Sequence, residues 1–150
     1  MKKKLIFAIV LNVCLSSLLI QFAYADVEQR RSELLSVLDE ELREVTRLNK
    51  QIGAQRPDLM LRMAQILLEK GRLLKDAENQ KYLEVNADKR DKVNKDEAFK
   101  NSRRYFEQAQ KTVLVLLKKF PRFNEKADAY YILAYNAKDI KQEEESKKYF

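Results

Sequence analysis

Residues that break helices are scarce in this chain, and their scarcity decides most of what it can fold into. Only two glycines and two prolines occur in 150 residues. An all-β domain needs many tight turns, and this chain has too few turn residues for that class. Hydrophobic residues make up 45% of the sequence. We therefore expect an all-α fold of long helices around one modest core.

The composition also excludes several kinds of functional site. The chain has no histidine and a single cysteine. It therefore lacks a Ser-His-Asp triad, a histidine-ligated metal, a cysteine zinc cluster and an intrachain disulfide. Adjacent carboxylates such as Glu40 and Glu41 point about 100° apart on a helix, which does not make an acid/base pair across a cleft. We expect no catalytic residue, no metal and no cofactor, and we expect the chain not to be an enzyme.

The first 25 residues are typical of a signal peptide for Sec-dependent export. Three lysines at 2–4 precede an apolar run over 5–20, and Ala23 and Ala25 occupy the two small positions that signal peptidase reads. Charged sequence begins at Asp26. We therefore expect cleavage between Ala25 and Asp26 and a periplasmic mature protein. The alternatives are an uncleaved membrane anchor and, through Cys14, a lipoprotein.

Cleavage changes the charge of the chain. It removes three lysines and no acidic residue, so the formal net charge falls from +7 to +4. It also removes the only cysteine, which suits an oxidising compartment. The remaining basicity is weak, and we expect no nucleic-acid partner. Membrane contact is expected only through the signal segment, if that segment stays uncleaved.

Residues 26–56 are expected to form an N-terminal amphipathic helix. Apolar residues recur every three or four positions there, at Leu34, Leu38, Leu42, Val45, Leu48 and Ile52. This stripe fits a packed helix or a short coiled-coil arm. Gly53 and Pro57 separate it from the next helix, since proline suits the first turn.

Residues 57–150 are expected to contain the remaining helices. The stretch from Asp58 to about Val85 is too apolar for a helix with one side in water, so we expect neighbours on two sides. Residues 86–98 predict an exposed loop or a solvated helical extension. Further helices are predicted over about 98–120, from Asn124 to near Asp139, and from near Lys141 to the last residue.

The spacings in this region resemble those of the tetratricopeptide repeat family in its cell-envelope variety. Met60, Met63, Ala64 and Leu67 resemble the first helix of a repeat, with Ala64 at the small crossing position and Gly71 as the turn. A second helix and its closing proline resemble Ala109, Val113, Leu116 and Pro121. The start of another repeat, with an aromatic-proline pair before it, resembles Phe120, Pro121, Phe123, Ala127, Tyr130, Tyr131, Leu133 and Ala134. The resemblance implies stacked antiparallel helical hairpins.

Some residues depart from the repeat pattern. The chain between Gly71 and Ala109 is longer than a standard repeat allows, Ala137 replaces a tyrosine, and Lys141 replaces the turn glycine. An unrelated helical bundle is the alternative. Ser146 and Phe150 fit a partner helix, but no polar capping helix follows. We therefore expect Tyr149 and Phe150 to be exposed or frayed, and the repeat region to be incomplete or its end to dock elsewhere.

The family resemblance also implies candidate contacts with a partner. Tyr131 and Tyr135 share one helix face, and in this family that face lines a peptide groove; Asp128 and Lys138 would join them. Packing against a neighbouring helix is the alternative for the tyrosines. The expected function is a periplasmic, non-enzymatic adaptor that binds proteins of the cell envelope, with no small-molecule substrate. The alternatives are a small basic chaperone for unfolded envelope proteins and, third, an accessory subunit of a cell-wall enzyme.

Overall fold

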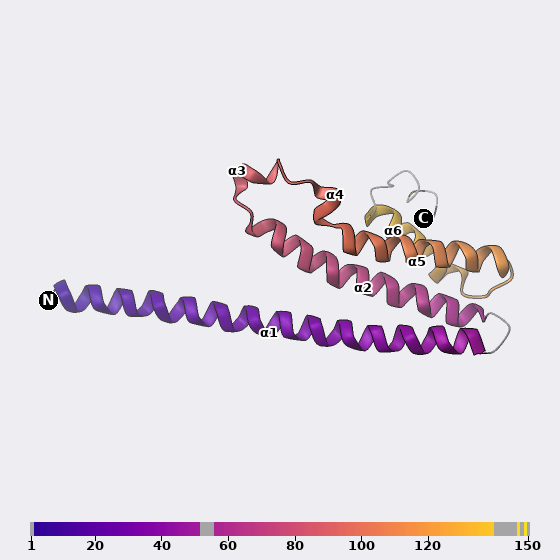
Figure 1. Ribbon diagram of the computed structural model, residues 1–150, viewed down its shortest axis with the longest axis horizontal. Coiled ribbons are helices and arrows are strands. Elements are labelled where there is room, and N and C mark those ends of the chain that lie inside the picture. Colours follow the sequence, from indigo (N-terminus) through magenta and orange to yellow (C-terminus); the bar gives the residue numbers. More distant parts are fainter. Residues whose placement is uncertain (1, 52–55, 140–146, 148, 150) are drawn as a thin grey trace. The chain divides into compact units, whose positions relative to one another are not determined.

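Over the residues that it describes, the computed structural model contains only helices. It describes residues 2–51, 56–139, 147 and 149, and for residues 2–25 and 139 it describes the backbone alone. The helices are α1 Lys2–Gln51, α2 Pro57–Glu84, α3 Ala87–Arg90, α4 Lys95–Ala98, α5 Lys100–Lys119 and α6 Lys126–Asp139 (Figure 1). The all-α class expected from the scarcity of glycine and proline is confirmed.

The chain divides into two compact units, Met1–Ser36 and Val37–Phe150. The first unit consists of most of α1, where Asp26 and Arg30 form an exposed ion pair at 2.8 Å and Arg31 pairs with Glu28. Both pairs link successive turns of one helix, as i,i+4 and i,i+3 partners do. All long-range packing described below lies within the second unit.

Helix α2 is packed on two sides, as its apolar sequence predicted. Pro57 occupies the first turn, and the helix ends at Glu84, one residue before the expected limit. One face joins a core cluster with α5 and α6, formed by Met60, Leu61, Ala64, Leu67, Leu68, Phe106, Ala109, Val113, Leu116, Ala129, Ile132 and Leu133. The other face, through Ile66, packs on Leu38 and Val45 of α1.

Two ion pairs connect the end of α1 to α2. The Arg62 guanidinium donates to Glu41 at 2.6 Å, and this hydrogen bond is the main cause of the raised pKa of Arg62. Lys70 is almost completely buried, pairs with Asp39 and places its ammonium 4.6 Å from the centre of the Tyr105 ring on α5. Lys70 therefore contacts both helices that flank α2.

Helices α2 and α5 form an antiparallel hairpin (Figure 1). The expectation that Gly71 forms a turn is wrong, because α2 continues through it. Gly71 is instead the point where the Phe106 ring of α5 lies against the α2 backbone. Further along the hairpin, the Glu78 carboxylate accepts hydrogen bonds from the N–H groups of Asn101 and Ser102, at 3.0 and 3.3 Å. These N–H groups lie in the first turn of α5 and have no partner within their own helix.

The segment between the two long helices is largely exposed, as predicted, and contains the short helices α3 and α4. Arg90 ties it to the end of α2 by donating to the carbonyls of Leu83 and Val85. Asn94 caps α4, since its side chain accepts from two backbone N–H groups. The Phe99 ring packs on Tyr82 with a centroid distance of 5.9 Å, so the segment has a defined place beside α2.

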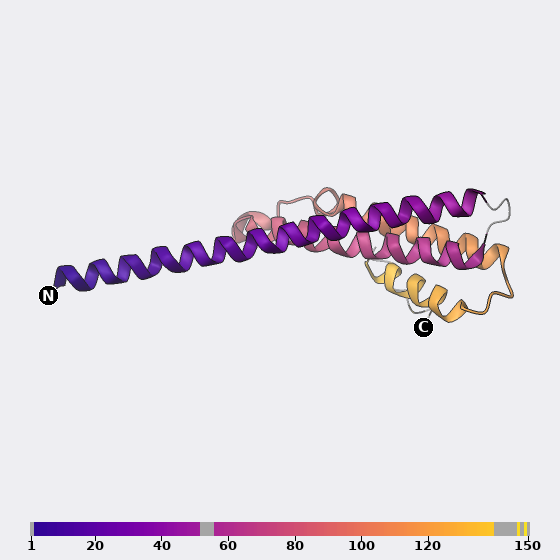
Figure 2. The ribbon, with the colours of Figure 1, turned by 90° about the horizontal axis from the view of Figure 1, so that it is seen from below.

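Helix α6 packs on one side of the α2–α5 hairpin (Figure 2). Its buried residues are Ala129, Ile132, Leu133, Ala134, Asn136 and Ala137. The Asn136 side chain is fully buried and donates to the backbone carbonyl of Phe106 at 3.0 Å. This hydrogen bond helps to set the position of α6 along the axis of α5.

The predicted last helix lies mostly outside the described residues, and Lys141, Ser146 and Phe150 are among those left out. Tyr149 is described, and the expectation that it is exposed is wrong. Its side chain is half-buried, and its ring stacks on Tyr130 with a centroid distance of 6.4 Å.

Candidate functional site

The exposed face of α6 carries the four residues that the sequence singled out for partner binding. Asp128, Tyr131, Tyr135 and Lys138 follow one another at steps of three, four and three, so they share one side of the helix. All four are exposed, and Tyr131 and Tyr135 keep 52% and 38% of their surface in water. The opposite side of α6 holds the buried alanines and leucine, so the tyrosines are not part of the core.

An arginine of α2 joins these tyrosines. The Tyr131 and Tyr135 rings lie 5.6 Å apart at an interplanar angle of 44°. The Arg72 guanidinium lies 4.3 Å from the centre of the Tyr135 ring, which is cation–π distance. We call these three residues the Arg72 ledge. Its rings and guanidinium are planar surfaces that another molecule can contact without displacing any core residue.

A groove runs between α2 and α6 beside the Arg72 ledge. We call it the α2–α6 groove; its volume is about 490 Å³. Its apolar lining is Leu68, Leu73 and Ile132, and its polar lining is Gln65, Glu69, Arg72, Asp128 and Tyr131. Leu68 and Ile132 are buried members of the core and form the floor, whereas Glu69, Asp128 and Tyr131 are exposed at the rim.

The sequence explains why the two helices form this groove. Ala64 and Ala129 are both fully buried in the core cluster that α2 and α6 share, and small side chains let helices approach closely. Their neighbours in sequence, Gln65 and Asp128, are polar residues that line the groove. The result is a shallow apolar channel with charged edges of both signs.

Two carboxylates and one guanidinium give the groove its charge. Glu69 and Asp128 lie on different helices, and Arg72 follows Glu69 by almost one turn of α2. Such a rim offers acceptors and donors to a polypeptide, and tyrosine and arginine are the residue types that most often dominate binding energy at protein interfaces. Among the described residues, no group of histidine, cysteine, aspartate or glutamate could hold a metal ion.

The structure brings together three of the four candidate residues. Asp128 and Tyr131 line the groove, and Tyr135 adjoins it through the Arg72 ledge. Lys138 lines a different cavity, between α2, α4, α5 and α6. Sequence reasoning missed the contribution of α2. The available signal was the row of polar residues at Gln65, Glu69 and Arg72, spaced four and three apart and therefore on one side of the helix.

The predicted signal-peptidase residues lie in α1. The backbone is helical at Ala23 and Ala25, whose side chains are not described, and Asp26 is exposed beside Arg30. Over the described part of the chain, no helix has an apolar stretch long enough to cross a membrane.

No protein-family model, curated protein or solved structure matches this chain. The functional argument therefore depends on the sequence and on the geometry of the groove.

Proposed function

We propose that this protein is an exported, non-enzymatic adaptor that binds partner proteins of the cell envelope through the α2–α6 groove. The observation that carries the proposal is the Arg72 ledge: two exposed tyrosines and a half-buried arginine stacked on one of them lie beside a groove with an apolar floor. Exposed aromatic residues at such a position are typical of protein-binding surfaces.

The order of the helices supports a tetratricopeptide-like arrangement. Helix α2 pairs with α5 in an antiparallel hairpin, and α6 packs against both of them. In a repeat array, α2 and α6 would be the first helices of successive repeats, and the groove between them would be the inner, peptide-binding face. The segment 86–98 would then be an insertion between the two helices of the first repeat.

The groove proposal is tested by site-specific photocrosslinking. A benzophenone amino acid placed at Tyr131 is expected to crosslink one reproducible envelope protein in cells of the native host. The matched control is the same substitution at Leu114, which is 46% exposed on α5 and does not line the groove. The crosslink at position 131 is expected to disappear in an Arg72→Ala background. Equal crosslinking at both positions, or none at position 131, would refute a partner site in the groove.

Export is tested on the mature chain. The proposal is a periplasmic protein cleaved after Ala25, on the basis of the basic start, the apolar run and the small residues at 23 and 25. N-terminal sequencing of the protein from a periplasmic extract is expected to begin at Asp26. A full-length chain in the membrane fraction would favour the uncleaved anchor.

A second candidate function, a periplasmic chaperone, has one observation in its favour. Val27, Leu34 and Val37 of α1 are 47%, 52% and 61% exposed, so the helix presents apolar side chains to water. The chaperone proposal predicts that the purified protein suppresses aggregation of an unfolded outer-membrane protein, more strongly at low salt. Leu34→Ser/Val37→Ser is expected to abolish that effect, whereas Tyr131→Ala would leave it unchanged. The adaptor proposal predicts the reverse dependence for partner binding.

A further inference from the structure

The turn between α5 and α6 presents an arginine at an exposed tip. The N–H group of Phe123 donates to the carbonyl of Phe120 at 3.0 Å, so residues 120–123 form a β-turn with Pro121 and Arg122 at its centre. Both central residues are exposed, whereas the Phe120 and Phe123 side chains are partly buried and pack against the core. Proline favours the second position of such a turn. The proline and the two rings therefore hold Arg122 in a defined place, away from the core.

Two lysines lie at the same end of the second unit as this turn. Lys118 is exposed in the last turn of α5, and Lys50 is exposed in the last turn of α1. We call Lys50, Lys118 and Arg122 the basic end. Lys119 has an interaction of its own and is not counted among these residues.

The start of α2 connects the parts of the basic end. Figure 1 shows the start of α2 beside the end of α5. Pro57, the first residue of α2, lines a cleft of about 500 Å³ together with Arg122. The residue before it, Arg56, donates its N–H to the side chain of Asn49 at 3.2 Å, next to Lys50. The end of α1 and the turn therefore both contact the start of α2.

The charges of the basic end are not balanced by ion pairs. Lys50, Lys118 and Arg122 are exposed, and none of them forms an ion pair with another described residue. They come from α1, α5 and the turn, so they gather by folding and not by sequence alone. Like charges gathered in this way create a local positive potential that attracts an anionic partner.

The carboxylates near the basic end have cations of their own or face another site. Two of them accept hydrogen bonds from arginines, in the pairs Arg56–Asp58 at 3.1 Å and Arg47–Glu44 at 2.8 Å. Glu125 is exposed, and Lys126 follows it directly in the sequence. Asp128 lines the α2–α6 groove. These groups therefore leave a surplus of positive charge at the basic end.

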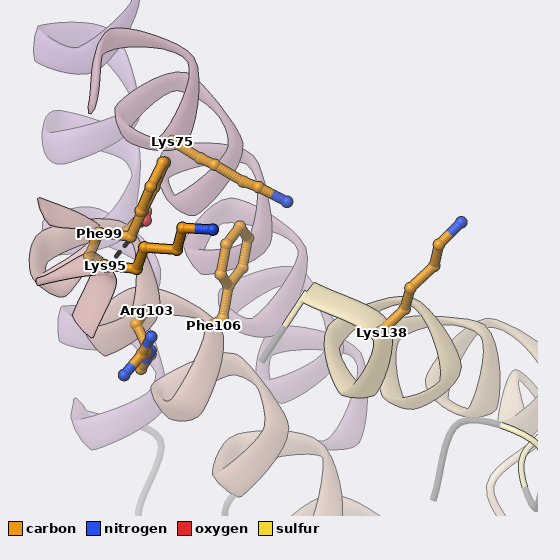
Figure 3. A pocket seen from close by; sticks show the side chains of 7 residues that line it. Lys75, Lys95, Phe99, Arg103, Phe106 and Lys138 are labelled. Atoms are coloured by element: carbon orange, nitrogen blue, oxygen red, sulfur yellow. Dashed lines mark hydrogen bonds between the residues drawn. The ribbon is translucent and has the colours of Figure 1, made fainter. Parts of the chain in front are cut away.

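The basic residues at the other end of the hairpin are arranged differently. Figure 3 shows Lys95 and Arg103 beside Phe106, around a cavity of about 250 Å³. Arg103 donates to Asp96 at 2.8 Å, and the Glu78 carboxylate caps the first turn of α5 there. Carboxylates therefore offset the cations around this cavity, which the basic end does not share.

We propose that the basic end binds an anionic phospholipid surface of the envelope, with Arg122 at the point of contact and the lipid phosphates as the bound groups. A bilayer presents many phosphates that separate cations can reach independently, so it does not require the shape complementarity of a protein interface. The Phe120 and Phe123 rings are partly buried in the protein, so the contact is with headgroups and not with acyl chains.

This inference goes beyond the adaptor function. The cleft at the basic end and the α2–α6 groove have no lining residue in common. A protein held at a membrane by the basic end would therefore keep the groove open to a partner. The contact would belong to the mature chain, independently of the signal segment.

The test is co-sedimentation of the chain that begins at Asp26 with lipid vesicles. Omitting residues 1–25 removes an apolar run that would insert into vesicles by itself, and the buried apolar residues described all lie from Leu38 to Ala137. Binding is expected on vesicles of phosphatidylglycerol and phosphatidylcholine, and no binding on phosphatidylcholine alone. Raising the salt from about 50 to about 300 mM is expected to weaken binding at least about tenfold.

Two variants of equal charge separate the basic end from general basicity. A basic residue near an anionic bilayer strengthens binding about fivefold, so Lys118→Gln/Arg122→Gln is expected to weaken it about 25-fold. Lys89→Gln/Lys92→Gln removes two exposed lysines from the segment between α2 and α5, and the affinity is expected to change less than about twofold.

A dye reports which end of the protein meets the vesicle. The only cysteine of the sequence is Cys14, so the chain that begins at Asp26 can be labelled at one introduced cysteine. A polarity-sensitive dye at Asn124→Cys, in the cleft of the basic end, is expected to shift to the blue on phosphatidylglycerol vesicles. The same dye at Asn86→Cys, which is exposed before α3, is expected not to shift.

Four results would overturn the proposal. They are an equal loss of binding in both variants, equal binding to vesicles with and without phosphatidylglycerol, and a dye shift at position 86 but not at position 124. The fourth is binding of polyglutamate that depends on Lys118 and Arg122 in a protein that does not bind the vesicles. That result would assign the basic end to an acidic protein instead.

Discussion

Gly71 and Phe106 fit together so closely that no side chain can be added to the glycine. A Cβ built on Gly71 would lie 2.5 Å from Cε1 and 2.6 Å from Cδ1 of the Phe106 ring. The ring is almost fully buried, so it has little room to move away. The glycine is therefore what allows α2 and α5 to approach at this point.

Gly71→Ala is expected to destabilise the protein by about 1–3 kcal/mol through this clash. The substitution would favour the helix itself by about 1 kcal/mol, so a net loss shows that packing outweighs helix propensity. The measurement is urea unfolding followed by circular dichroism. Phe106→Leu in the same chain is expected to recover part of the loss. Additive effects of the two substitutions would mean that the residues do not interact.

Asn136 provides a second test of the core. Its amide donates to the Phe106 carbonyl, and its Oδ1 has no hydrogen-bond partner within the described part of the chain. Asn136→Ala is expected to cost about 1–3 kcal/mol of unfolding free energy. Asn136→Asp has nearly the same shape, but it places a carboxylate beside a carbonyl oxygen in the core. It is expected to cost more than alanine at neutral pH, and thermal unfolding of both variants checks the order. Equal melting temperatures would contradict a buried site.

Lys70 and Asp39 are expected to be energetically coupled. Lys70 is 4% exposed, whereas the Asp39 side chain keeps 52% of its surface in water. Asp39→Asn leaves the buried ammonium without its counter-charge, and a loss of about 1–3 kcal/mol is expected. In a Lys70→Met chain the same change is expected to cost much less, because no buried charge remains. A double-mutant cycle from denaturant unfolding measures this coupling, and a value near zero would contradict the ion pair.

The pKa of Asp58 is expected to depend on Arg56. The hydrogen bond from Arg56 lowers the pKa of Asp58 below its ordinary value, against a smaller opposing effect of burial. A lowered pKa means that the pair stabilises the fold above the ordinary aspartate pKa, and that this contribution is lost as the pH falls through the lowered value. Arg56→Gln is expected to raise the Asp58 pKa, as measured by ¹³C NMR of its carboxyl carbon. An unchanged titration curve would show that the pair does not persist in solution.

The sequence predicts those parts of the fold that depend on local pattern. The start of α2 at Pro57, its two packed sides and the exposed segment between α2 and α5 follow from proline chemistry, hydrophobic periodicity and charge. The role of Gly71 could not be predicted in this way. As a local signal, glycine indicates a turn, and only the partner ring of Phe106, far along the chain, explains its place inside a helix.

The candidate site was predictable to a similar degree. Helical spacing placed Tyr131 and Tyr135 on one face of α6, the family resemblance added Asp128, and all three are exposed. The same spacing could not show that Arg72 would stack on Tyr135, because it depends on how α2 and α6 pack together. The family resemblance grouped Lys138 with the tyrosines, whereas Lys138 lines a different cavity.

The Glu78 carboxylate has a consequence for how the hairpin assembles. The first turn of α5 is capped by a residue of α2 instead of by a neighbour in sequence. The first turn of α5 is therefore capped only when the hairpin closes, because its two N–H groups cannot reach Glu78 until both helices are in place. A peptide containing α5 alone would be expected to fray at its start, and the two helices to gain and lose their order together.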